Sequence, residues 1–142
     1  MKRSIMILGA IMVLCNVSNM LAQEKTMRSV LIDAGKWYYM NCDTICSLGH
    51  FYTKMGMGAF VLKNGVLTES KECVPYYLSD EADVEFDESK VGKKENGKYL
   101  IRKTLETEKF YVYEILELNN KEFIMIDVND SSNRQRYVSK EF

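Results

Sequence analysis

The chain has 142 residues, a formal net charge of −1, and a composition that is 46% hydrophobic and 27% charged. This length is typical of a single domain that buries a core of its own. The charge is small and mixed and contains no basic block, which argues against a protein that binds nucleic acid.

Residues 1–23 have the pattern of a secretory signal peptide. Lys2 and Arg3 form a basic start, residues 5–14 are apolar, and Ala22 supplies a small residue at the end of the segment. An apolar run this short does not form a stable membrane span. The pattern therefore predicts export to the periplasm or the cell exterior.

The remaining residues, 24–142, are predicted to form one domain. A lipid anchor at Cys15 is less favoured, because a lipid-acceptor cysteine normally follows a small residue and Cys15 follows Leu14. Alternating apolar and polar residues dominate this part of the chain, and long helical periodicity is missing. This alternation indicates short strands.

The expected strands follow one another at short intervals. The first covers residues 36–41. A hairpin follows over residues 59–70, with Asn64-Gly65 as its turn, because Asn-Gly is the strongest short hairpin signal. Further strands are expected at residues 74–78, 84–87, 98–104 and 135–140.

A second hairpin is expected over residues 110–128. Asn119-Asn120 is its predicted two-residue turn, because both residues tolerate a left-handed backbone. Pairing outward from that turn brings six side chains to one face, which is predicted to be the core face: Tyr111, Tyr113, Ile115, Ile124, Ile126 and Val128. The polar stretch 129–133 is predicted to be a loop before the last strand.

Eight or nine short strands with short connections predict an all-β fold. An antiparallel up-and-down β-barrel of about eight strands is favoured, because closure removes the exposed sheet edges. A β-sandwich is the alternative. A barrel of this size is just wide enough to hold one small ligand, or to be filled by its own side chains.

The first expected strand opens with Gly35-Lys36-Trp37, and Arg134 and Arg136 lie at the last one. With the aromatic hairpins between them, this pattern resembles the lipocalin-like β-barrels common among small secreted bacterial proteins. In that family the tryptophan of a Gly-x-Trp motif closes the barrel floor, and an arginine from a late strand packs over it. The resemblance implies that Trp37 lies at the floor with Arg136 or Arg134 across it.

Cys42 and Cys46 follow directly after the first expected strand. Their place resembles that of the Cys-x-x-Cys in envelope copper-response lipoproteins of the NlpE type, with the spacing Cys-x-x-x-Cys here. This weaker resemblance implies a metal-responsive or redox role for the segment.

Cys42, Cys46 and His50 would share one face if they lay on a helical turn. Thiolate and imidazole ligands suit zinc or copper. Three methionines nearby would add soft thioether ligands for copper: Met40, Met55 and Met57. The first interpretation of the segment is therefore a metal site.

The competing and favoured interpretation is a structural disulfide, because the cysteines of an exported chain pair in an oxidising compartment. A bond from Cys42 or Cys46 to Cys73 would leave one thiol over. Residues 41–54 would then be a pinned loop that acts as a lid or rim of the barrel.

Six tyrosines are candidate ligand-binding residues, because an apolar ring with a polar tip suits a pocket for a small apolar ligand. They are Tyr38, Tyr39, Tyr76, Tyr77, Tyr111 and Tyr113. The alternative is that these rings only fill the interior. The spacing around His50 identifies neither a nucleophile nor an orienting partner, so catalysis is not expected.

The sequence thus predicts a secreted or periplasmic binding protein, not an enzyme, that holds a small apolar ligand in a β-barrel without a cofactor. One alternative is a copper- or zinc-responsive envelope sensor that uses Cys42, Cys46 and His50. The other is a protein-interaction module with a filled barrel.

Overall fold

The computed structural model describes residues 24–104 and 107–140, so the predicted signal peptide lies outside the described residues. No helix in these residues has the length and apolar character needed to cross a membrane. The elements follow in the order α2 (Met27–Asp33), β1 (Trp37–Asn41), β2 (Thr44–Tyr52), β3 (Gly56–Lys63), β4 (Val66–Glu69), β5 (Val74–Ser79), η1 (Glu88–Lys90), β6 (Tyr99–Lys103), β7 (Phe110–Leu118), β8 (Glu122–Asp127) and β9 (Asp130–Ser139).

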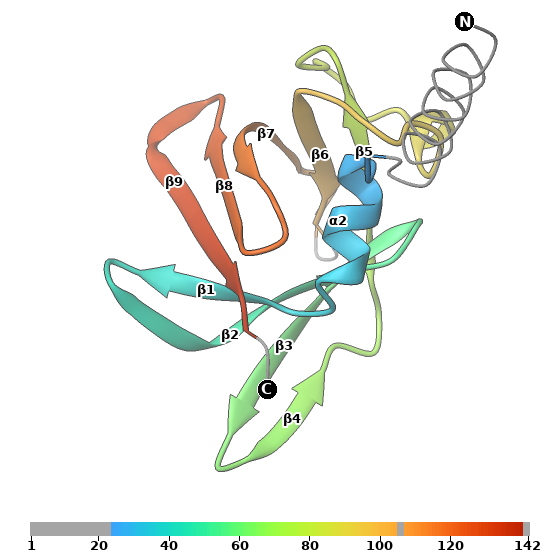
Figure 1. The fold of residues 1–142 in the computed structure, drawn as a ribbon. Coiled ribbons are helices and arrows are strands. Elements are labelled where there is room, and N and C mark those ends of the chain that lie inside the picture. Colours follow the sequence, from blue (N-terminus) through green and yellow to red (C-terminus); the bar gives the residue numbers. More distant parts are fainter. Residues whose placement is uncertain (1–23, 105–106, 141–142) are drawn as a thin grey trace, which may run out of the picture.

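Eight of the strands form a closed antiparallel barrel (Figure 1). Neighbours in the sequence are neighbours in the barrel, except that β5 follows β3, and the ring closes where β1 pairs with β9. Within the described residues β4 pairs only with β3 and extends with it away from the barrel. The predicted up-and-down barrel is therefore confirmed, and the sandwich alternative is wrong.

The helix α2 closes one end of the barrel, which we call the floor; the opposite end is the mouth. The hydroxyl of Thr26 caps the helix by accepting a hydrogen bond from the Ser29 amide. Leu31 is fully buried, and the indole Nε1 of Trp37 donates to the main-chain oxygen of Leu31 over 3.0 Å. Gly35, with φ of +71°, turns the chain from the helix into β1. The indole of Trp37 thus lies at the floor.

The connection between β5 and β6 clamps this helix from outside. Arg28 is 2% exposed, and its Nη1 donates to the Gly92 oxygen and to Glu95 Oε1, each over 3.0 Å. The main chain adds a hydrogen bond from Arg28 N to the Glu95 oxygen. The floor is therefore fixed by both main-chain and side-chain contacts.

The interior around the floor is filled with large side chains. The fully buried ones include Trp37, Tyr76, Leu78, Leu100, Phe123 and Met125. Trp37 meets Phe123 edge to face, with ring centroids 5.7 Å apart, a geometry that aromatic pairs favour. The floor end of the barrel is therefore tightly packed.

A second apolar cluster lies on the outside of the barrel, over β5, β6 and β7. Tyr77, Ile101 and Val112 are buried there, and Phe86 packs 5.1 Å from the ring of Tyr77. The prediction of a strand at residues 84–87 is wrong. Because β5 pairs directly with β6, these residues find no free sheet edge and instead cover the cluster.

The Asn64-Gly65 turn is confirmed. Both residues have positive φ, 52° and 76°, and Lys63 pairs with Val66 across the turn. This is the backbone that a two-residue hairpin requires.

The loop between β7 and β8 is longer than the two residues predicted. The side-chain oxygen of Asn119 accepts hydrogen bonds from the amides of Lys121 and Glu122, each over 2.9 Å, and β8 starts at Glu122. A bulge between residues 115 and 117 shifts the pairing of the two strands once more.

The predicted core face of β8 is consequently wrong. Phe123 and Met125 are fully buried, whereas Ile124 and Ile126 are half-buried and Val128 is 42% exposed. A shift of one residue in register moves every side chain of a strand to the opposite face. The length of the turn therefore decided which side chains line the interior.

The predicted lid over residues 41–54 is also wrong, because most of this segment is strand β2. Asn41 pairs with Thr44, so Cys42 and Asp43 form a tight turn, and Cys42 takes a positive φ of 53°. The predicted loop at 129–133 is likewise mostly strand, since β9 already begins at Asp130.

Candidate ligand site at the barrel mouth

The wall of the barrel is interrupted beside β3, and a cavity of about 480 Å³ opens there. β5 pairs with β3 at only two positions, and residues 70–73 leave the sheet between β4 and β5. Ser70 still extends the pairing of β4 with β3, because its amide donates to the Ala59 oxygen and its Oγ accepts from the Ala59 amide. The cavity lies between this gap and the turn from β6 to β7. Its lining residues are His50, Met57, Ala59, Ser70, Glu72, Val74, Arg102, Thr104, Thr107, Lys109 and Tyr111.

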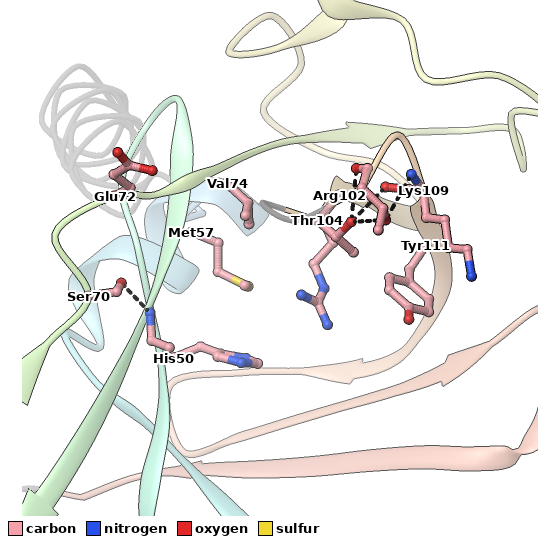
Figure 2. Close-up of a pocket in the computed structure, with 11 residues that line it drawn as sticks. His50, Met57, Ser70, Glu72, Val74, Arg102, Thr104, Lys109 and Tyr111 are labelled. Atoms are coloured by element: carbon pink, nitrogen blue, oxygen red, sulfur yellow. Dashed lines mark hydrogen bonds between the residues drawn. The ribbon is translucent and has the colours of Figure 1, made fainter.

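Three side chains from different strands converge on this space. Figure 2 shows the imidazole of His50, the guanidinium of Arg102 and the ring of Tyr111 directed toward its centre. Met57 and Val74 supply apolar surface beside them, and Val74 is 7% exposed. The cavity thus combines an apolar wall with a few polar groups.

Arg102 is held by two tyrosine rings. Its guanidinium carbon lies 5.4 Å from the ring centre of Tyr111 and 5.3 Å from that of Tyr113, and its Nη2 donates to the Tyr113 hydroxyl over 3.1 Å. Cation–π contacts of this kind stabilise a guanidinium beside an aromatic ring. Its Nε is buried and has no hydrogen-bond partner among the described residues.

No carboxylate in residues 24–104 or 107–140 lies within ion-pair distance of Arg102. The other charged lining residues are Lys109 and Glu72. Arg102 and Lys109 against Glu72 give the lining residues an excess of one positive charge.

His50 lies on β2 with its ring 5.2 Å from the ring of Tyr137. Its Nδ1 is buried, and no described residue forms a hydrogen bond with it. Burial and, to a lesser extent, the charge of Arg102 lower the pKa of His50 to about 4. The imidazole is therefore neutral at pH 7, with one nitrogen that donates and one that accepts.

Tyr52 brings a third unpartnered polar atom to the barrel interior. Its ring is 4% exposed and packs edge to face on Tyr76, yet its hydroxyl makes no hydrogen bond to the part of the chain that the structure describes. Burial, the largest cause, holds the pKa of Tyr52 well above its usual value. Most buried polar atoms in proteins have a partner, so a group of three on one interior marks a polar region inside the barrel.

The six predicted tyrosines separate into three groups. Tyr111 lines the cavity and Tyr113 contacts Arg102 beside it. Tyr39 packs edge to face on Tyr137 at 5.6 Å, and Tyr76 donates to the Thr53 oxygen over 2.7 Å.

Tyr38 and Tyr77, in contrast, belong to clusters outside the barrel. Tyr38 packs against Phe60 at 4.9 Å, and Tyr77 lies under Phe86. Neither lines the cavity.

The arginine that the resemblance places over Trp37 is not found there. Arg136 is exposed and its Nε pairs with Glu122 over 2.5 Å, and Arg134 is exposed as well. Both alternate along β9 with the buried Tyr137, so they belong to the outer face of that strand. The arginines of the interior are instead Arg28 near the floor and Arg102 at the cavity.

Sequence reasoning missed Arg102 as a site residue. The sequence contains a signal for it, because Arg102 lies two residues after Leu100, a buried apolar residue of the short strand β6. Side chains two residues apart on a strand lie on the same face.

The three described cysteines, Cys42, Cys46 and Cys73, are free, so the structure does not contain the predicted disulfide. Cys73 lies beside Gly56 at the start of β3, whereas Cys46 lies on the part of β2 that runs beyond the pairing of Leu48 with Val61. With about 3.3 Å per residue along a strand, Cys46 and Cys73 are separated by well over the roughly 7 Å that a disulfide can span.

The helical turn assumed for Cys42, Cys46 and His50 is a strand with a tight turn before it. Residues four apart on a strand are about 13 Å apart, too far to ligate one ion. The residues that the structure describes contain no group of three metal-ligating side chains.

The fold and this cavity define a closed antiparallel barrel with a packed floor and an open, polar-lined mouth. Comparisons with protein families, with curated proteins and with solved structures find no match for the chain. The resemblance to lipocalin-like barrels stays a prediction.

Proposed function

We propose that the protein is an exported binding protein that holds one small ligand, mostly apolar, in the mouth of its barrel. The observation that carries this proposal is the cavity of about 480 Å³ onto which His50, Arg102 and Tyr111 converge. Ligand pockets in proteins typically measure ~300–1,000 Å³ and combine apolar walls with a few placed polar groups. The pattern of residues 1–23 supports export.

Binding is favoured over catalysis by the contacts of the cavity's hydroxyl groups. Ser70 Oγ accepts from a main-chain amide, and Thr104 and Thr107 bond to each other and to the main chain of the β6–β7 turn. None of these hydroxyls is hydrogen-bonded to His50, the one base among the lining side chains that is neutral at pH 7. A hydroxyl nucleophile needs such a base within reach.

The test is binding of the neutral dye N-phenyl-1-naphthylamine, whose fluorescence rises when it leaves water. We expect saturable binding of one dye per chain. Ala59 is an exposed position on the cavity wall, so Ala59→Trp fills the space and should abolish the signal without a loss of folding. Val66→Trp, at a site 64% exposed on β4 and away from the cavity, is the matched control and should bind as the wild type does.

Dye binding that Ala59→Trp leaves unchanged would place the ligand elsewhere. A complete absence of binding in the wild type would contradict the proposal and favour the protein-interaction module.

A further inference from the structure

The positively charged guanidinium of Arg102 lies in the barrel without a carboxylate partner among the described residues. Arginine stays protonated in proteins and offers five N–H donors. Here the described residues supply one acceptor, the Tyr113 hydroxyl, and among them the buried Nε has no hydrogen-bond partner. A partly buried cation with neither a counter-charge nor a full set of acceptors is costly.

The neighbouring charged residues do not provide such a partner. Lys109 adds a second positive charge at the cavity, and Glu72 is exposed and makes no ion pair within the described residues. The buried carboxylate of Asp127 accepts a hydrogen bond from the Asn129 amide and does not line the cavity. The residues that the structure describes therefore supply no counter-charge for Arg102, which points to an anionic ligand.

The surroundings of Arg102 also limit the shape of that counter-charge. The rings of Tyr111 and Tyr113 hold the guanidinium in cation–π contact, and Figure 2 shows it directed into the cavity. A planar fork of donors matches a carboxylate, which can accept two parallel hydrogen bonds. Met57, Val74 and Tyr111 offer apolar surface for whatever is attached to that carboxylate.

We propose that the ligand of the mouth cavity is an amphiphilic monoanion, a carboxylate on an apolar chain or ring, whose carboxylate pairs with Arg102. This inference rests on the proposed function, that the cavity binds a small ligand, and adds the chemical class of the ligand. Arg102 is the residue that selects the anion, and the apolar wall holds the remainder.

The experiment compares three probes with the same apolar chain, namely decanoate, decanol and decylammonium, by titration calorimetry on the folded protein at pH 7. We expect decanoate to bind at least about tenfold more tightly than decanol, because charge-assisted hydrogen bonds are about twice as strong as neutral ones. Decylammonium should bind more weakly than decanol, because its positive charge is repelled by that of Arg102.

Arg102→Met keeps an apolar stem and removes the charge. It should weaken decanoate about tenfold, to the level of decanol, and leave decanol within about twofold of the wild type. Lys109→Met removes the other cation of the cavity and is the matched control, which should retain the preference for decanoate. Arg102→Lys, which keeps the charge without the planar fork, should give an intermediate affinity and serves if Arg102→Met does not fold.

The outcomes separate this inference from the proposed function. Equal binding of decanoate and decanol by the wild type overturns the anion proposal and leaves the ligand cavity intact, as does binding of the neutral dye without binding of decanoate. A preference for decanoate that survives Arg102→Met but is lost in Lys109→Met also overturns it, because the anchor is then Lys109. Failure of all three probes and of the dye contradicts the proposed function itself.

Discussion

At the scale of single residues, the cavity contains the one histidine of the chain. His50 lies against Tyr137 and near Arg102, and both burial and the neighbouring cation oppose its protonation. Its pKa therefore reports both the burial of the imidazole and the electrostatic effect of Arg102. Because no other histidine occurs, its imidazole resonance is unambiguous in a proton spectrum.

We predict that His50 makes the folded protein less stable as the pH falls from about 6.5 to about 4. Above the unfolded-state pKa of about 6.5 both states are neutral and His50 contributes nothing. Below it the unfolded chain binds a proton that the folded chain, with a pKa of about 4, does not. The loss approaches about 3 kcal/mol at the lower end, at roughly 1.4 kcal/mol per unit of pKa.

The measurement is urea unfolding of the wild type and of His50→Gln at pH 7 and pH 4.5. The carboxylates titrate in both proteins, so the difference between the two isolates His50. An identical pH dependence of the two proteins would contradict the prediction. An NMR titration of the wild type should give the same pKa, about 4.

The residues also show where sequence reasoning about the site ends. Tyrosines were easy to nominate, but Tyr38 and Tyr77 lie outside the barrel because outer clusters around Phe60 and Phe86 bury them. When both faces of a strand carry aromatic side chains, alternation alone does not show which face is inside. The sequence does not predict Arg102 as a site residue, because charged side chains normally face water.

At the scale of elements, the sequence predicted a hairpin correctly where the residues of its turn favour one turn type. Asn64-Gly65 fixed the pairing of β3 with β4, whereas Asn119 formed a longer loop and a bulge then changed the register of β7. The helix α2 was missed, since seven residues give only two turns and too little periodicity to detect.

The pairing of β1 with β2 depends on a close approach at Gly49. A Cβ at this position would lie 1.9 Å from the main-chain oxygen of Trp37, which no side chain can accommodate without backbone movement. We predict that Gly49→Ala destabilises the protein by more than about 2 kcal/mol, the scale of other overpacking substitutions. Gly65→Asn is the control, because asparagine tolerates the positive φ of that exposed turn.

Urea unfolding followed by the fluorescence of Trp37, the one tryptophan of the chain, measures both variants. A Gly49→Ala variant as stable as Gly65→Asn would show that the two strands can separate here at little cost.

At the scale of the whole molecule, the barrel divides its interior between stability and binding. The floor is filled by Leu31, Trp37 and Phe123, whereas the cavity opens beside β3 and the turn from β6 to β7. The closed barrel itself was predictable from the number of strands and the shortness of their connections. The open mouth was not predictable, because it depends on the break between β4 and β5, and residues 70–73 contain no turn motif that would indicate this break.

This division predicts that the floor can be weakened without a change in ligand binding. Leu31→Ala removes a fully buried side chain next to Trp37 and should lower the free energy of unfolding by about 2–5 kcal/mol. Dye affinity at 25 °C should stay within about twofold of the wild type while the protein remains folded. Ile32→Ala, at a half-buried position on the same helix, should cost less stability, and a parallel loss of affinity and stability in Leu31→Ala would contradict the division.

The break between β4 and β5 also bears on how this barrel can diversify. Residues 71–73 are not paired with any strand. The chain can therefore lengthen or shorten there while every strand keeps its register. Loop length costs little in closure entropy, and Glu72 already borders the cavity. Insertions and deletions in this short segment would therefore reshape the entrance for new ligands on an unchanged scaffold.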